Sequence, residues 1–299
     1  MSLLVVGSIA FDTVHTPAET RERQLGGSAT YFSVSASNFA DVHMVGVVGQ
    51  DFGQDNVDFL KSKGINTEGI EVADGETFHW EGRYGDNPND RDTLNTCLNV
   101  FETFQPKLPS HAKEIEYLFL ANIDPALQLQ VLDQMTNLKF CACDTMNLWI
   151  DIARDKVVEL ISKVDAIILN DSEAQQLTSE NNLVKAAEAI IAMGTTTVVI
   201  KKGEHGCVFF RDGSYFTAGA YPLADVRDPT GAGDTFAGGF MGHIAKSGNT
   251  DEDTMRKAII YGSSLASFCC EDFGLGRLKT VTADEVEKRF EEFRRMSMF

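Results

Sequence analysis

One short string of the sequence combines residue types that bind a phosphate with a residue that can accept a proton. From Asp228 to Asp234 the chain reads DPTGAGD, and the small, apolar run TFAGGF follows directly. Gly231 and Gly233 leave the neighbouring backbone amides unobstructed, so a ligand oxygen can approach them closely. A helix is predicted to begin at Ala232, where unpaired N–H groups and the helix macrodipole favour an anion.

Asp234 lies at the same helix start, beside the place where a phosphate would bind. A carboxylate there can accept the proton of an attacking hydroxyl while a phosphoryl group is transferred. The alternative is purely structural, because an acid in the first turn favours the helix dipole and glycines allow close packing. The full string is more specific than a bare Gly-x-Gly, and it indicates phosphoryl transfer to an alcohol.

The composition restricts the partners that such a site can serve. The chain has 299 residues and a formal net charge of −18. So acidic a surface repels nucleic acid and anionic membranes, and we expect neither as a partner. The start MSLLVVGSIAFD lacks a basic segment and is too short for a signal or membrane span, which predicts a cytoplasmic protein. Cys141 and Cys143 could form half of a zinc site, but alternation along a strand is favoured because no second pair has ligand spacing.

Short apolar runs alternate with helical patterns along most of the chain. Strands are predicted at 3–6, 43–48, 117–120, 139–143, 166–169, 198–200 and 207–210, and helices at 28–39, 56–63, 127–135, 183–193, 232–246, 253–270 and 283–295. This alternation predicts a three-layer α/β/α sandwich with a mostly parallel central sheet.

Residues 75–101 break this pattern. His79, Glu81 and Arg83 alternate with Phe78 and Trp80, which is the period of a strand with two different faces, and 86–90 form a turn cluster. Two extended strands inserted in an α/β chain predict a small β-sheet lid, with an ordinary edge hairpin as the alternative. A lid would exclude water, which competes as a phosphoryl acceptor.

Four further strings stand in a recognisable order around the DPTGAGD string. They are GSIAFD at 7–12, GGSATY at 26–31, NDSE at 170–173 and KKGEHG at 201–206. Together these strings resemble the signatures of the ribokinase/PfkB family of carbohydrate and nucleoside kinases. The resemblance implies one ribokinase-like domain over 1–299, with a lid formed mainly by about 75–101 plus a segment near 10–20.

The resemblance also implies the reaction and its acceptor site. The reaction would move the γ-phosphoryl group of ATP to a hydroxyl of a small sugar or sugar-like molecule, with Asp234 as general base. Asp12, Gly26, Gly27 and Tyr31 would bind the acceptor. By themselves, Asp12 is equally a turn or cap residue and the two glycines are a plain loop.

The nucleotide side of the site is implied in the same way. Asn170 and Glu173 would act near Mg²⁺, with Glu173 reaching the metal through water, although alone they indicate a helix N-cap with Glu at N3. Lys201, Gly203 and Gly206, together with Gly233 of the first string, would bind the nucleotide. A hairpin turn between two strands is the structural alternative for Gly203 and Gly206.

Two further features of the family concern a cation and a partner. Asp228, Thr230 and Gly274 match positions that help to bind a monovalent cation in many relatives, so K⁺ activation is an open prediction. Lids of this family often meet across a homodimer, which makes pairing through the lid a second open prediction.

Departures from ribokinase itself leave the acceptor open. Ala10, Ser28 and Tyr31 stand where ribokinase carries polar donors, while aromatic residues such as Trp80 could stack on a sugar face or a nucleobase. A nucleoside kinase is therefore the main alternative. Arg83 or Arg91 could instead receive the phosphate of a sugar phosphate. A non-catalytic sensor of sugar or nucleotide is a third reading, which the intact Asp234 disfavours.

Overall fold

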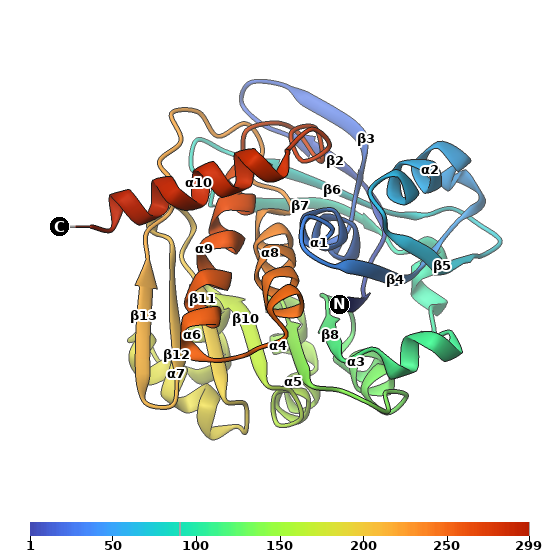
Figure 1. Cartoon of the computed structure of the whole chain (residues 1–299). Helices are drawn as coiled ribbons and strands as arrows, with labels where there is room; N and C mark the ends of the chain where they lie inside the picture. The colour runs from blue at the N-terminus through green and yellow to red at the C-terminus, as the bar shows by residue number, and fades with distance from the viewer. Residues whose placement is uncertain (90, 299) are drawn as a thin grey trace.

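The computed structural model describes residues 1–89 and 91–298, which form two β-sheets and surrounding helices (Figure 1). The larger sheet has nine strands in the order β13-β12-β11-β10-β9-β8-β1-β4-β5. Their bounds are β1 Ser2–Val6, β4 Asp41–Val48, β5 Asn66–Val72, β8 Tyr117–Leu120, β9 Phe140–Asp144, β10 Ala166–Asn170, β11 Thr197–Lys201, β12 Cys207–Arg211 and β13 Ser214–Ala218. Neighbours are parallel from β5 to β11, and β12 and β13 add an antiparallel edge.

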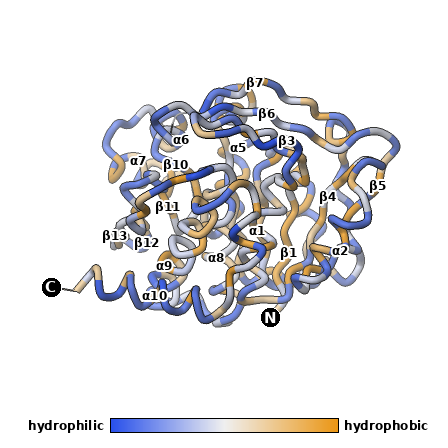
Figure 2. The backbone as a smooth tube through the Cα atoms, turned by 90° about the horizontal axis from the view of Figure 1, so that it is seen from above, coloured by the Kyte–Doolittle hydropathy of each residue, from blue (hydrophilic) through white to orange (hydrophobic). Residues whose placement is uncertain are grey.

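Two hydrophobic cores lie on opposite faces of this sheet. Along β1, Leu3 and Val5 point into one core, and Leu4 and Val6 point into the other. The first core is covered by α1 Ser28–Ala36, α2 Gln54–Ser62, α8 Ala232–Ser247 and α9 Glu252–Cys269, and α10 Ala283–Met296 packs on α9. The second core is covered by α3 Pro125–Leu132, α4 Asn147–Ile152, α5 Arg154–Ile161, α6 Asp171–Thr178 and α7 Leu183–Ala192. Hydrophobic residues accordingly gather along the strands and inner helices in Figure 2.

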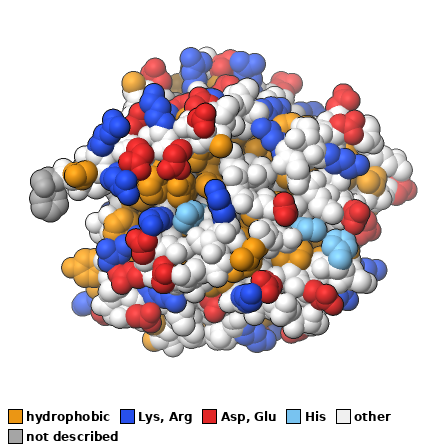
Figure 3. Space-filling view, in the orientation of Figure 1, with side chains coloured by type: hydrophobic (Ala, Val, Ile, Leu, Met, Phe, Trp, Pro, Cys, Tyr) orange, Lys and Arg blue, Asp and Glu red, His pale blue; other side chains and the backbone are white. Residues whose placement is uncertain are grey.

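The predicted α/β/α sandwich is confirmed, and each of the seven predicted strands falls on an observed one. Short 3₁₀ helices complete the connections: η1 Gln50–Phe52, η2 Asn99–Thr103, η3 Ser110–Glu114 and η4 Gly203–His205. Cys141 and Cys143 both lie buried in β9, as alternation along a strand requires. On the face shown in Figure 3, acidic and basic side chains are interspersed. Among the described residues, no helix is both long and apolar enough to cross a membrane.

The smaller sheet has four strands in the order β3-β2-β6-β7. They are β2 Ala10–His15, β3 Thr20–Gly26, β6 Phe78–Tyr84 and β7 Arg91–Cys97. Two strands come from the start of the chain and two from the inserted segment 75–101, whose turn cluster the structure describes except at position 90. The register places Trp80 opposite Asp12 and Arg91 opposite Tyr84. Because opposite residues share a sheet face, this register decides which side chains can meet a substrate.

Candidate active site

The DPTGAGD string forms a turn that leads into α8. Gly231 precedes the helix in the left-handed conformation, with φ 75° and ψ 1°, which a glycine adopts without strain. A side chain at Gly231 would also collide with the ring of Tyr31, which packs directly beneath the turn. Tyr31 therefore supports the turn in this structure, and a contact with the acceptor remains a prediction.

Asp234 lies in the first turn of α8 and faces a cation from the large sheet. Lys201 ends β11, and its Nζ lies 2.7 Å from the point where a Cβ on Gly233 would stand. Burial raises the pKa of Asp234, whereas the positive charges of Lys201 and Arg91 lower it. The helix N-terminus, the ammonium group and the carboxylate thus meet at one place.

Carboxyl ends of three adjacent parallel strands supply groups to the same place. Asp144 ends β9, Asn170 ends β10 and Lys201 ends β11, with Asp144 opposite Ile168 and Asn170 opposite Lys201. The Asp144 side chain is 5% exposed, and its Oδ1 has no hydrogen-bond partner among the described residues. Burial, followed by the negative charge of Asp234, raises the pKa of Asp144 well above its usual range. Two carboxyl groups this close do not ionise together easily, so a positive charge beside them favours the ionised form of both.

Asn170 and Glu173 form the helix cap that their spacing predicts. The Asn170 side chain accepts a hydrogen bond from the Glu173 amide at 2.8 Å, and Glu173 Oε2 accepts one from the Asn170 amide at 2.7 Å. Burial raises the pKa of Glu173, opposed first by Lys201. The cap leaves Glu173 Oε1 outside this reciprocal pair of hydrogen bonds.

Asp12 and the two glycines at the end of β3 are also brought together. The Asp12 carboxylate fills the space that a Gly26 side chain would need, and Gly27 begins α1 with φ 93°. Burial, and then the negative charge of Asp228, raises the pKa of Asp12 to about 7. Ser28 does not add a free donor here, because its Oγ lies 3.1 Å from Ser8 Oγ and bonds within the protein.

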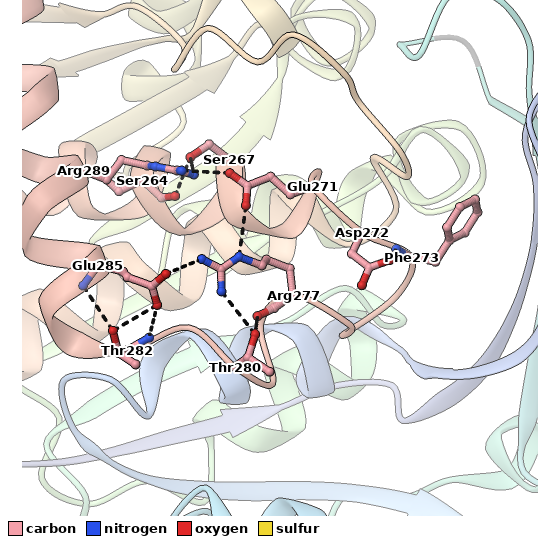
Figure 4. Close-up of polar contacts among 10 residues, drawn as sticks. All are labelled: Ser264, Ser267, Glu271, Asp272, Phe273, Arg277, Thr280, Thr282, Glu285 and Arg289. Carbon is pink, nitrogen blue, oxygen red and sulfur yellow. Dashed lines mark hydrogen bonds and ion pairs between the residues drawn. The ribbon is translucent and has the colours of Figure 1, made fainter.

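The residues of the predicted cation site lie in contact. Asp228 accepts hydrogen bonds from the amides of Thr230 at 2.8 Å and Gly274 at 3.0 Å, so it joins the DPTGAGD turn to the loop that carries Gly274. That loop is held in turn by a network of ion pairs (Figure 4). Arg277 bonds Glu271 at 3.1 Å and Glu285 at 2.6 Å, and Arg289 bonds Glu271 at 2.8 Å.

The smaller sheet contacts the site with one of its two faces. Trp80 and Tyr84 share the face of Asp12, and the Tyr84 hydroxyl lies 3.2 Å from Thr230 Oγ1. His79 lies on the opposite face, where its Nε2 is 2.9 Å from Thr13 Oγ1. His79 therefore points away from the site.

The turn between β6 and β7 reaches the predicted nucleotide loop. Asn89 donates a hydrogen bond to Glu204 of η4, and its side chain occupies the space above Gly203. Gly203 and Gly206 both have positive φ and shape the hairpin between β11 and β12, so the structural reading of this loop is confirmed. Nucleotide binding by this loop remains a prediction.

Comparison with known proteins decides the family. The model of the pfkB family carbohydrate kinases matches residues 2–281. This chain belongs to the PfkB family. The members of the family are ATP-dependent phosphotransferases, so this PfkB kinase acts on a sugar or a nucleoside, and the predicted ribokinase-like fold is confirmed.

The proteins similar to this PfkB kinase include nucleoside kinases and ribokinases. The cytidine kinase of Thermococcus kodakarensis is 27% identical over 84% of this chain and 91% of that protein. The nucleoside kinase of Burkholderia thailandensis, solved with inosine, has a TM-score of 0.81 at 20% identity over 98% of both chains. A ribokinase II candidate from Escherichia coli, solved with ATP and Mg²⁺, has a TM-score of 0.79 at 17% identity over 97% of this chain and 99% of that one. These two structures share the fold.

Asp144 and Arg91 are the members of the site that the motifs did not single out as catalytic. Asp144 follows the alternating Cys141 and Cys143, so a carboxylate at the end of a buried strand was the available signal. For Arg91 the signal was weaker, because only the register between β6 and β7 decides which face it occupies.

Proposed function

We propose that this protein transfers the γ-phosphoryl group of ATP to a hydroxyl of a nucleoside, with Asp234 as the general base. The observation that carries the proposal is the meeting of Asp234, the Lys201 ammonium and the N-terminus of α8. A base, a cation and unpaired N–H groups at one point are the groups that phosphoryl transfer to an alcohol requires.

Each group has a distinct part in the reaction. Asp234 accepts the proton of the acceptor hydroxyl, whose oxygen forms a bond to the γ-phosphorus as the bond to the ADP oxygen breaks. The amides of Gly231, Gly233 and Asp234 stabilise the negative charge that develops on the phosphoryl oxygens. The Ala232 amide donates to the Pro229 carbonyl at 3.2 Å, so it joins them only when that turn opens. Lys201 adds a point charge at the same place. Asp234 then releases its proton to solvent when the product leaves.

Magnesium fits the acidic side of this site. Glu173 keeps one carboxylate oxygen outside its helix cap, and Asp144 has a buried oxygen with no partner among the described residues. Hard oxygen ligands of this kind suit Mg²⁺, which is bound mainly through water and phosphate oxygens. The metal would neutralise phosphate charge when bound. The neighbour solved with ATP and Mg²⁺ supports this assignment.

The surroundings of Asp12 favour a nucleoside over a free sugar. Asp12 would accept hydrogen bonds from two ribose hydroxyls, and the amides beside Gly26 and Gly27 would meet the sugar oxygens. Ser28 is engaged within the protein and offers no further donor for a free sugar. Trp80 lies on the face of Asp12 and offers a flat surface for a base. The cytidine kinase relative, which the match covers to 91% of its length, supports the same acceptor.

A closing lid, a monovalent cation and a dimer complete the proposal. The smaller sheet would close over the acceptor through the Tyr84–Thr230 contact and exclude water.

K⁺ would bind near Asp228 and Gly274, and two copies would pair through the outer face of the smaller sheet. Sedimentation velocity on the purified protein tests the pairing: a single monomeric species over the micromolar range would contradict it.

A substrate panel tests the proposed acceptor. Purified protein with ATP and Mg²⁺ is assayed for ADP release with three classes of acceptor. The nucleosides are cytidine, inosine and adenosine, the free sugars are ribose and fructose, and the sugar phosphates are ribose 5-phosphate and fructose 6-phosphate. We expect the highest kcat/KM with a nucleoside. A free sugar or a sugar phosphate as the best acceptor would contradict the nucleoside assignment and leave the kinase standing. Ligand binding without turnover on the whole panel would favour a sensor.

A further inference from the structure

A β-bulge interrupts the smaller sheet directly beside Asp12. Asp12 of β2 lies opposite Gln24 of β3. Two positions later Val14 lies opposite Arg21, so two residues of β3 face Thr13 alone. An extra residue of this kind bends its strand and changes the direction of neighbouring side chains. The bulge therefore sets the direction in which the Asp12 carboxylate points.

Arg23 lies at this bulge in a strained backbone conformation. Its φ is 47°, in the left-handed region that residues other than glycine rarely adopt. The Arg23 amide donates a hydrogen bond to Thr13 Oγ1 at 3.2 Å, and Gln24 Nε2 donates one to the Glu22 carbonyl at 3.0 Å. A residue in such a conformation persists only where its surroundings hold it there.

Contacts with the larger part of the protein hold Arg23 in place. Its Nη2 donates a hydrogen bond to Asp51 Oδ2 of η1 at 2.7 Å, and its Cζ lies 4.5 Å from the centre of the Phe11 ring. Asp51 Oδ1 also accepts hydrogen bonds from the amide and the hydroxyl of Thr77, both at 2.7 Å. Thr77 directly precedes β6. Asp51 thus joins two strands of the smaller sheet, β3 and β6, to the connection between β4 and α2.

The Arg23 side chain lies on the other side of the smaller sheet from the proposed acceptor. It covers Phe11, which precedes Asp12 in β2 and so faces the opposite way. The same outer face carries His79, whose Nε2 is 2.9 Å from Thr13 Oγ1. Arg23 can therefore influence acceptor binding only through the backbone of the bulge.

We propose that Arg23 is a positioning residue, whose ion pair with Asp51 holds the left-handed backbone conformation that aims Asp12 at the acceptor. The inference rests on the proposed role of Asp12 in binding the acceptor. The Asp12 carboxylate fits closely against Gly26, so a small change in the direction of the strands would withdraw it from the acceptor hydroxyls. An exposed ion pair contributes little to the stability of a fold, and this one acts by the conformation that it selects.

Three variants separate this backbone role from a direct side-chain contact. Arg23→Gln removes the ion pair and leaves a residue that disfavours the left-handed region, so the affinity for the best nucleoside should fall by about 10-fold. Arg23→Gly removes more of the side chain but adopts the same φ without strain, and it should recover most of that affinity. Asp51→Asn keeps an oxygen for Thr77 but cannot accept from Arg23, and it should match Arg23→Gln.

Asp212→Gln is the matched control. Asp212 also has a left-handed φ, of 51°, and an ion pair with Arg211, but it lies in the turn between β12 and β13. Calorimetric titration gives the nucleoside affinity of each protein, and the control should keep the wild-type value. In steady-state kinetics Arg23→Gln should raise the KM of the nucleoside and leave the KM of ATP unchanged. A larger loss of affinity in Arg23→Gly than in Arg23→Gln would overturn the inference, because the side chain would then act by contact.

A titration of Asp12 decides the inference without nucleotide or acceptor. Burial raises the pKa of Asp12 to about 7, and the NMR signal of its carboxyl carbon follows its ionisation. In Arg23→Gln the carboxyl gains solvent and should ionise at a lower pH, whereas Arg23→Gly and Asp212→Gln should ionise near the wild-type pH. An unchanged titration in Arg23→Gln would overturn the inference, even if a nucleoside were phosphorylated. A lower titration in Arg23→Gln alone would support it, and if no acceptor were phosphorylated the proposed reaction would fail separately.

Discussion

Replacing Gly233 by alanine probes the contact between Lys201 and α8 with one methyl group. Gly233 lies in the first turn of the helix and does not need a positive φ, so alanine fits its backbone. The nearest atoms to an added Cβ are Lys201 Nζ at 2.7 Å and Lys201 Cε at 3.7 Å. The methyl group therefore collides with the ammonium and with nothing rigid.

The expected magnitude follows from these distances. Ordinary contact begins at 3.4 Å, so the ammonium must retreat by at least 3.4 − 2.7 = 0.7 Å. A displacement of about 1 Å in a catalytic group can lower a rate by up to about 100-fold, and we expect kcat to fall by about 10- to 100-fold. Alanine in place of glycine within a helix adds about 0.5–1 kcal/mol of stability, so the free energy of unfolding should be equal or higher.

The assay compares kcat and urea unfolding for Gly233→Ala and for Gly219→Ala, a control with no heavy atom within 4 Å of the added Cβ. The control should match the wild type in both. Gly233→Ala is also made in a Lys201→Met background, where the ammonium is absent and the added methyl group should have no further effect. A loss of kcat that is equally large in that background would refute the reasoning.

Three other perturbations have defined outcomes. Asp12 has its pKa raised from 3.8 to about 7, so the folded state binds a proton that the unfolded state releases, and stability falls as pH rises from about 4 to 7. Asp12→Asn should flatten that dependence and stabilise the free protein above pH 7 by up to about 4 kcal/mol while lowering kcat/KM; parallel melting curves from pH 5 to 8 would contradict this. Gly231→Ala should destabilise by more than about 2 kcal/mol in urea unfolding, because it combines a left-handed conformation with the Tyr31 clash. Exchange of K⁺ for tetramethylammonium should lower kcat severalfold, and Asp228→Asn should remove that dependence; equal rates in both salts would contradict a cation at Gly274.

The central strands were predictable because both of their faces are buried. β8 and β10 read as uninterrupted apolar runs bounded by polar residues, which is the pattern of a parallel strand under two helix layers. Strands β3 and β5 were not predicted, since their sequences TRERQLG and NTEGIEV lack a clear alternation of apolar residues. Both are edge strands and have a neighbour on one side only, so packing demands little of their side chains.

The sequence predicted those residues of the candidate site that stand together in one short string. It did not predict the residues that only the pairing of strands brings to the site. The glycines of the DPTGAGD string can be read from the sequence, because a tight turn before a helix needs them. Asp144 and Arg91 are ordinary residues locally, and only strand pairing brings them to the centre. Asn170 and Glu173 show the reverse case: their spacing predicted a helix cap, which the structure confirms, while a metal role for the same residues stays a prediction.

Asp234→Asn tests the central claim most directly. The substitution keeps the size of the side chain and the start of α8 but removes the group that would accept the hydroxyl proton. Single-turnover rates and calorimetric affinity for ATP with Mg²⁺ are measured on the same preparation. The account predicts a rate about 1,000-fold lower, with ATP affinity within about 3-fold of the wild type. A variant that transfers the phosphoryl group at a near-normal rate would contradict the assignment of Asp234 as the base.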